Sequence, residues 1–232
     1  MKTLFLLLGL SVWVAQGAQA QSSCASDGQA TPVTLVERFI SADCEACWSA
    51  PQTRPPAAGA LTLDWIVPGK QGDDAPLSAA ASQDALMRLQ TLGRAAPTTS
   101  TRTSAPVVGG RASRLRVAHG LPLGGYIGAS IELKTALRPR GQAPLSAWLV
   151  LVETIPAGTD GTSTERNLIR NVLKLPWNKH NQLLKTEHIM FHETRPLSIP
   201  SGATPERLRV VGWVQDGRGR ILTAAQSVCA PT

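Results

Sequence analysis

Short apolar runs separated by polar, turn-rich segments recur along most of the chain. In the first half, the runs 33–40 and 61–67 predict two strands, because each is apolar, short and bounded by turn residues. Between 77 and 93, leucines and a methionine form an apolar stripe at helical spacing, and Gly93 is well suited to end that helix. The Ser/Thr-rich segment 95–103 is expected to be a loop.

From about residue 118 onward, strand patterns dominate and helical patterns are rare. Asp216-Gly217 predicts the turn of a closing hairpin. Strands and a helix alternate in the first half, while strands joined by turns fill the second, so we expect an α+β protein with an α/β N-terminal lobe at about 30–115 and an antiparallel β-sandwich-like lobe at about 118–229. The strands predicted for the second lobe are 127–137, 145–154, 186–193, 208–215 and 221–228.

The first twenty residues predict export. Lys2 precedes the apolar stretch 4–14, which is too short to span a bilayer, and Ala18 and Ala20 occupy the positions that a signal peptidase recognises. We therefore expect residues 1–20 to be a signal peptide. The mature protein would be periplasmic or secreted, with no stable membrane insertion after cleavage.

Export changes how the four cysteines are interpreted, since an oxidising compartment favours disulfides. Four cysteines allow three pairings. The simplest is a local Cys44–Cys47 bond together with a structural disulfide between Cys24 and Cys229, which would join the two ends of the mature chain. A loop of about 200 residues closed in this way stabilises a fold by roughly 5 kcal/mol in the chain-entropy model.

Cys44 and Cys47 follow an apolar strand directly, and this placement predicts redox chemistry. A cysteine at the start of a helix gains thiolate character, and the thiolate is the reactive form. Cys44 would be the attacking thiolate and Cys47 would resolve the mixed disulfide. The predicted function is a thiol–disulfide oxidoreductase or redox-linked accessory protein that acts on protein thiols or disulfides without a cofactor.

The same residues carry a resemblance. The run V-T-L-V-E-R-F-I-S-A-D-C-E-A-C, the segment E-R-N-L-I-R-N-V-L-K-L and the closing V-V-G-W-V-Q-D-G-R-G-R-I-L-T-A-A resemble an uncharacterised family of secreted bacterial proteins. That family has a thioredoxin-like first half and a β-rich second half, so the resemblance implies a degenerate thioredoxin-like domain at 30–115. It also implies that Pro106, as a cis-proline, would sit against the dithiol and shape the partner groove.

Two alternatives to exchange chemistry remain open. Asp43 precedes the dithiol and Glu45 lies between its two cysteines, and both raise the cost of a thiolate, which favours an inert disulfide in a non-enzymatic binding or structural module. On the predicted strand 186–193, the alternating His188, Met190 and His192 would share one face and offer a copper site. The simpler interpretation of that strand is an ordinary half-buried one.

Charge and motif content exclude several classes. The net charge of +7 is spread along the chain and aromatic residues are only 4% of it, so nucleic acid is not an expected partner. The chain has no phosphate-binding loop, H-E-x-x-H or G-x-S-x-G motif, and Ser104, Asp64, His119 and His180 have no triad spacing. Trp148, Trp177 and Trp213 are expected in the core.

Overall fold

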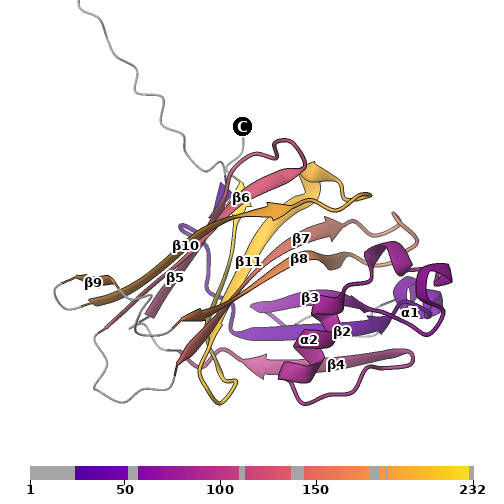
Figure 1. Ribbon diagram of the computed structural model, residues 1–232, viewed down its shortest axis with the longest axis horizontal. Helices are drawn as coiled ribbons and strands as arrows, with labels where there is room; N and C mark the ends of the chain where they lie inside the picture. Colours follow the sequence, from indigo (N-terminus) through magenta and orange to yellow (C-terminus); the bar gives the residue numbers. More distant parts are fainter. Residues whose placement is uncertain are drawn as a thin grey trace, which may run out of the picture.

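Two β-sheets form most of the molecule (Figure 1). The computed structural model describes residues 24–51, 57–109, 113–136, 144–177, 183–185 and 188–229. The smaller sheet is antiparallel throughout, in the order β13-β1-β5-β6-β10-β9. Its strands are β1 (Cys24–Ala25), β5 (Ser113–His119), β6 (Tyr126–Ala136), β9 (Leu183–Lys185), β10 (His188–Ser198) and β13 (Val228–Cys229).

The larger sheet has seven strands in the order β12-β11-β7-β8-β3-β2-β4. Within it, β2 runs parallel to β3 and β3 runs parallel to β8, whereas the other neighbours are antiparallel. Its strands are β2 (Thr34–Ser41), β3 (Ala60–Val67), β4 (Ser100–Pro106), β7 (Leu145–Ile155), β8 (Arg166–Trp177), β11 (Leu208–Gln215) and β12 (Ile221–Gln226).

The expected fold class is wrong. The part of the chain that the structure describes holds only two α-helices, α1 (Glu45–Ser49) and α2 (Gln83–Thr91), and the protein is mostly β. Strands from 30–115 do not form an α/β, thioredoxin-like lobe followed by a separate β lobe. Instead β3 pairs with β8 at Asp64 and Leu168, so strands from both halves of the chain share one sheet. The physical reason is that β2 pairs with only one hydrogen-bonding edge of β3, and β8 pairs with the opposite edge, which would otherwise be left unpaired.

Both faces of the larger sheet are covered. One face packs on the smaller sheet through a core that includes Val117, Ile131 and Leu149. The other face packs against α2, with Leu89 of the helix in one core with Trp65 and Trp213 (Figure 1). Burial on both faces explains why the central strands β7 and β11 are almost continuously apolar rather than alternating.

Most predicted elements are present, with shifted ends. The strands predicted at 33–40 and 61–67 are β2 and β3, and the predicted core tryptophans Trp148, Trp177 and Trp213 are buried. The helix expected at 77–93 is shorter: residues 78–80 form a 3-10 turn, and α2 begins after Ser82, whose hydroxyl accepts the amide of Asp84 at 3.0 Å.

The expected loop 95–103 is partly a strand. Residues 100–106 form β4, which pairs with β2 along its whole length and lies at the edge of the larger sheet. Its residues alternate between exposed and half-buried. This strand was not predicted because its sequence is rich in serine and threonine. An edge strand with exposed side chains needs few apolar residues.

A buried ion pair lies under α2. Arg88 donates from Nε and Nη2 to the two carboxylate oxygens of Glu37 at 2.8 and 2.6 Å, and from Nη1 to the side-chain oxygen of Gln215 at 2.7 Å. Trp65 also donates to Glu37, at 3.1 Å. The Arg88 guanidinium lies 4.8 Å from the ring centroid of Trp148. This cluster joins α2 to β2 and β11 with fully matched donors and acceptors.

The expected signal peptide, residues 1–20, lies outside the described residues. Across the part of the chain that is described, no helix has the length and apolar character to cross a membrane.

Candidate functional site

The structure contains the Cys44–Cys47 disulfide, as expected from the sequence, with an S–S distance of 1.99 Å. Cys44 is the residue just before α1, and a short turn separates it from the end of β2. Both cysteines are partly exposed, while the Glu45 side chain between them points to solvent. The disulfide is therefore reachable from the surface.

The carboxylate of Asp43, next to Cys44 in the sequence, is hydrogen-bonded to backbone groups. Its carboxylate accepts the backbone amides of Lys70 and Gln71 at 2.7 and 3.2 Å. These bonds tie the dithiol loop to the loop that follows β3. Part of the negative charge that the sequence places beside Cys44 is thus used to hold backbone groups.

Trp48 anchors α1 in the protein. It is 5% exposed and belongs to a small core with Ile40 and Leu168. Its ring nitrogen donates to the carbonyl oxygen of Asp160 at 2.8 Å. A helix of five residues is not stable by itself, so these tertiary contacts fix the position of the disulfide.

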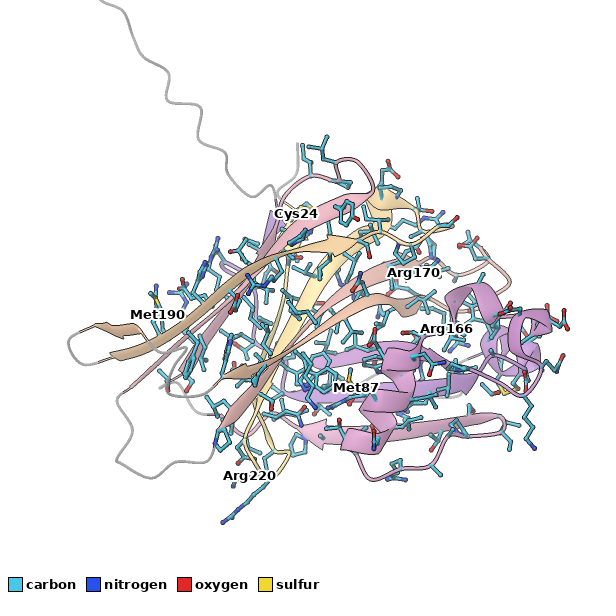
Figure 2. All side chains as sticks on the ribbon, viewed as in Figure 1. Cys24, Met87, Arg166, Arg170, Met190 and Arg220 are labelled. Carbon is cyan, nitrogen blue, oxygen red and sulfur yellow. A yellow bond between two sulfur atoms is a disulfide. The ribbon has the colours of Figure 1, made fainter. Side chains whose placement is uncertain are left out.

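Arg166, from the start of β8 and labelled in Figure 2, contacts the C-terminal end of α1. Its Nη2 donates to the carbonyl oxygens of Trp48 and Ala50 at 2.6 and 2.9 Å, where the helix leaves these acceptors without intrahelical donors. Burial lowers the pKa of Arg166 from its ordinary value, the nearby carboxylate of Asp64 acts in the opposite direction, and Arg38 lowers it further.

Asp64 is the buried carboxylate between these arginines. It lies 2.6 Å from Nε of Arg38 and 3.9 Å from Nη1 of Arg166, and it accepts the backbone amide of Asn167 at 2.8 Å. Its side chain is fully buried. The Asp64 carboxylate therefore forms ion pairs with the guanidinium groups of both Arg38 and Arg166.

A pocket of about 270 Å³ opens beside Cys47, and its walls are strongly basic. Arg102 of the edge strand β4 lies directly opposite Arg38 of β2 in the sheet register. Arg102 is exposed, and within the described residues its guanidinium has no hydrogen-bond or ion-pair partner. No acidic residue is among the described lining residues, which are Arg38, Ile40, Cys47, Ser100, Thr101, Arg102 and Arg166.

A larger cavity of about 650 Å³ shares Arg38 with this pocket. Its other basic group, Arg209, is already bonded to the side chains of Thr154 and Asn167. The described lining of this cavity contains no cysteine. The smaller pocket is therefore the one that combines guanidinium groups with sulfur.

Pro106 does not lie beside the dithiol. It pairs with Thr34 at the far end of β2, whereas the dithiol follows Ser41 at the other end of that strand. Its peptide bond is trans. Ser104 lies on the same strand, two residues before Pro106. The residues of β4 that do approach the disulfide are Ser100, Thr101 and Arg102.

The copper candidates lie on β10, far along the chain from the dithiol. Met190 is half-buried, and the His192 ring is 46% exposed, with its Nδ1 3.7 Å from a carboxylate oxygen of Glu132. The side chain of His188 and the whole of His180 lie outside the described residues. In the described part of β10, no group of three metal-ligating side chains converges.

The second expected disulfide is also present. Cys24 and Cys229 are bonded with an S–S distance of 2.02 Å and are separated by 205 residues in the sequence. They face each other on neighbouring strands, β1 and β13. This bond fastens the beginning of the described chain to its end.

The three arginines that line the pocket beside Cys47 were not predicted from the sequence. Arg38 was visible only as a charge that interrupts an apolar strand, and this interruption was the one available signal. Arg102 stood in a segment expected to be a loop. Arg166 gave no signal, because the carbonyl groups of α1 that it contacts lie more than a hundred residues away in the sequence.

Comparison with known proteins yields a likeness of fold. No protein-family model matches the sequence. No curated protein matches it either. The structure is similar to that of HBP35 of Porphyromonas gingivalis, with a TM-score of 0.50 and 12% sequence identity over 84% of this chain and 74% of that one. At this identity the likeness concerns the fold alone.

Proposed function

We propose that this protein is an exported thiol–disulfide exchange protein whose working bond is Cys44–Cys47. The observation that carries the proposal is the basic pocket against Cys47, which holds Arg38, Arg102 and Arg166. Guanidinium groups beside a cysteine stabilise its thiolate and lower the pKa of the thiol. An inert surface disulfide has no need of such surroundings.

Under this proposal the two sulfurs have different roles. A thiolate of the partner attacks Sγ of Cys44, forms a mixed disulfide with it and expels Cys47 as a thiolate. A second thiolate of the partner then attacks the partner's sulfur in that mixed disulfide and releases Cys44. The partner leaves with a new disulfide, and the protein holds the two electrons as a dithiol.

The arginines act on the leaving group. Disulfide exchange is faster when the departing thiolate is more stable, and the positive charge beside Cys47 provides that stability. In the opposite direction, Cys44 attacks a partner disulfide and Cys47 resolves the intermediate. Both directions keep the mixed disulfide on Cys44, at the exposed start of α1.

The partners under this proposal are protein thiols or disulfides, met in the periplasm or outside the cell. Two disulfides in the structure support an oxidising compartment. The signal peptide predicted for residues 1–20 supplies the route of export. The exchange chemistry needs no cofactor.

The deciding measurement is the reduction potential of Cys44–Cys47 in a glutathione redox buffer, with the bond followed by mass mapping. A working exchanger has a potential of about −120 to −230 mV, whereas a structural bond lies below about −300 mV. Replacing Cys44 with serine should abolish insulin reduction while the protein remains folded.

A charge variant tests the role of the pocket. Arg102→Gln should make the potential more negative by about 10 to 30 mV, because one pKa unit of thiolate stabilisation corresponds to roughly 30 mV. Arg218→Gln is the matched control, since this exposed arginine lies on the turn between β11 and β12, away from the dithiol. A potential below −300 mV, or equal shifts in the two variants, would identify Cys44–Cys47 as an inert bond in a binding or structural module.

A further inference from the structure

Three potential metal ligands meet at the other disulfide. Strand β1 lies between β5 and β13, and Cys24 is directly opposite His119 on one side and Cys229 on the other. Residues paired in this way project from the same face of a sheet. The two sulfurs and a ring nitrogen of His119 all lie within 4.8 Å of one another. Figure 2 labels Cys24, on β1, which is one strand in from the edge strand β13 of the smaller sheet.

His119 presents a buried nitrogen without a partner. Its side chain is 4% exposed, and its Nδ1 is 2.9 Å from the carbonyl oxygen of Gly120. A carbonyl only accepts hydrogen bonds, so Nδ1 carries the proton and Nε2 carries the lone pair. Among the described residues, Nε2 has no hydrogen-bond partner. Leaving such an atom unpaired costs about 1 to 3 kcal/mol, so its retention calls for an explanation.

We propose that reduction of Cys24–Cys229 turns this corner into a zinc site, with the sulfurs of Cys24 and Cys229 and Nε2 of His119 as ligands. Zinc prefers thiolate and imidazole ligands in a tetrahedral arrangement, at about 2.3 Å from sulfur and 2.0 to 2.1 Å from nitrogen. Tetrahedral geometry then separates the two sulfurs by about 3.8 Å, within the spacing that the three side chains already span. Water fills the fourth position, since Cys229 is exposed.

The surroundings of His119 suit a zinc ligand. Zinc-bound histidines usually donate their second ring N–H to a carbonyl or carboxylate, which fixes the ring and its tautomer. The bond from Nδ1 to Gly120 does this here.

The disulfide and the zinc site exclude each other because they use the same sulfurs. A dithiol reductant supplies two electrons and two protons, its own thiols form a disulfide, and Cys24 and Cys229 become thiols. Zinc then displaces the two thiol protons. In the reverse direction, a disulfide oxidant accepts two electrons from the two thiolates and is reduced to a dithiol, the Cys24–Cys229 bond forms again, and the metal is released.

Other contacts keep Cys24 beside His119 after the bond is cut. Ser26 donates its amide to the carbonyl oxygen of Val117 at 2.9 Å, and its hydroxyl accepts the amide of Val117 at 3.0 Å. Arg116 forms a two-pronged pair with Asp27 at 3.0 and 2.8 Å. These bonds hold β1 on β5, so Cys24 stays opposite His119 in the reduced protein.

Cobalt(II) and zinc(II) titrations test the proposal in a Cys44→Ser/Cys47→Ser background, which removes the other pair of thiols. The oxidised protein should take up no metal. After reduction by a dithiol, it should bind one equivalent of cobalt with thiolate-to-cobalt absorption, and zinc should displace the cobalt. His119→Ala keeps both thiols and should weaken zinc affinity by more than about tenfold, since even changes around metal ligands cost that much.

His192→Ala is the matched control, because this histidine is exposed on β10. It should leave the affinity unchanged. The proposal is overturned if the reduced protein shows no thiolate–cobalt absorption, or if His119→Ala binds zinc as tightly as the His192→Ala control. Thiol counting and circular dichroism of the reduced His119→Ala protein show that both sulfurs and the fold are intact, so weaker binding there supports the ligand role.

Discussion

Arg166 donates to the carbonyl oxygen of Trp48 at 2.6 Å, and this bond joins β8 of the second half of the chain to the helix that carries the disulfide. The same guanidinium reaches Ala50 at 2.9 Å. The position of Cys47 therefore depends on a residue 119 positions away in the sequence.

Replacing Arg166 with methionine should lower the free energy of unfolding by about 2 to 4 kcal/mol, because buried carbonyl groups lose a charged donor. Urea denaturation followed by tryptophan fluorescence measures the loss. Arg207→Met removes a surface pair with Asp160 and should cost under about 1 kcal/mol. Equal losses in the two variants would contradict a supporting role for Arg166.

The Arg88–Glu37 pair predicts strong coupling in a double-mutant cycle. Both side chains are almost completely buried. Arg88→Met alone should cost about 3 to 5 kcal/mol, because it leaves a buried carboxylate without its countercharge. Arg88→Met combined with Glu37→Leu should cost less than the sum of the two single changes by about 1 to 3 kcal/mol. Chemical denaturation of the four proteins gives the coupling, and strict additivity would argue against the ion pair.

The close approach of Gly69 to Asp43, the residue before Cys44, leaves no room for a larger side chain at position 69. A Cβ placed at residue 69 would lie 2.0 Å from Oδ1 of Asp43, so Gly69→Ala must displace that carboxylate from the amides of Lys70 and Gln71. We expect Gly69→Ala to lower the free energy of unfolding by about 1 to 3 kcal/mol, as measured by thermal denaturation. Adding Asp43→Ser to Gly69→Ala should remove the clash and recover part of the loss. No recovery would mean that the Asp43 contact is not what limits residue 69.

The lowered pKa of Asp27, which follows β1, makes the stability of the fold depend on pH. A side-chain hydrogen bond from Arg116 is the main factor that lowers the pKa of Asp27 below 3.8, while burial acts in the opposite direction. A carboxyl with a lowered pKa stabilises the fold above 3.8, and this contribution disappears as the pH falls through the folded-state pKa. NMR titration should show Arg116→Gln moving the pKa back toward 3.8. Arg114, at 4.0 Å and 76% exposed, should have a smaller effect when changed to glutamine.

Local patterns gave much of the secondary structure. The apolar runs at 33–40 and 61–67 are strands, and Gly93 follows the end of α2 with a positive φ of 64°. These predictions succeed because alternation and turn residues act within a few positions along the chain. The strand β4 escaped prediction because its edge position leaves its side chains polar and half-exposed.

The predicted fold class failed for a different reason. Period-two patterns specify that a segment is extended, but they do not specify which strand lies beside it. Nothing in the composition of β3 or β8 indicates that Asp64 and Leu168 are neighbours. A strand–helix alternation therefore resembled a separate α/β lobe, while the actual sheet continues across both halves of the chain.

The sequence alone indicated most of the extended segments and the simplest of three possible cysteine pairings, because Cys44 and Cys47 are only three positions apart and Cys24 and Cys229 are the two cysteines that remain. The structure contains this pairing. Only the tertiary structure decided what surrounds those sulfurs. Arg38, Arg102 and Arg166 reach Cys47 because β4, β2 and β8 belong to one sheet, and His119 reaches Cys24 because β5 pairs with β1. Strand order is set by the long-range burial of both sheet faces, which no short stretch of sequence encodes.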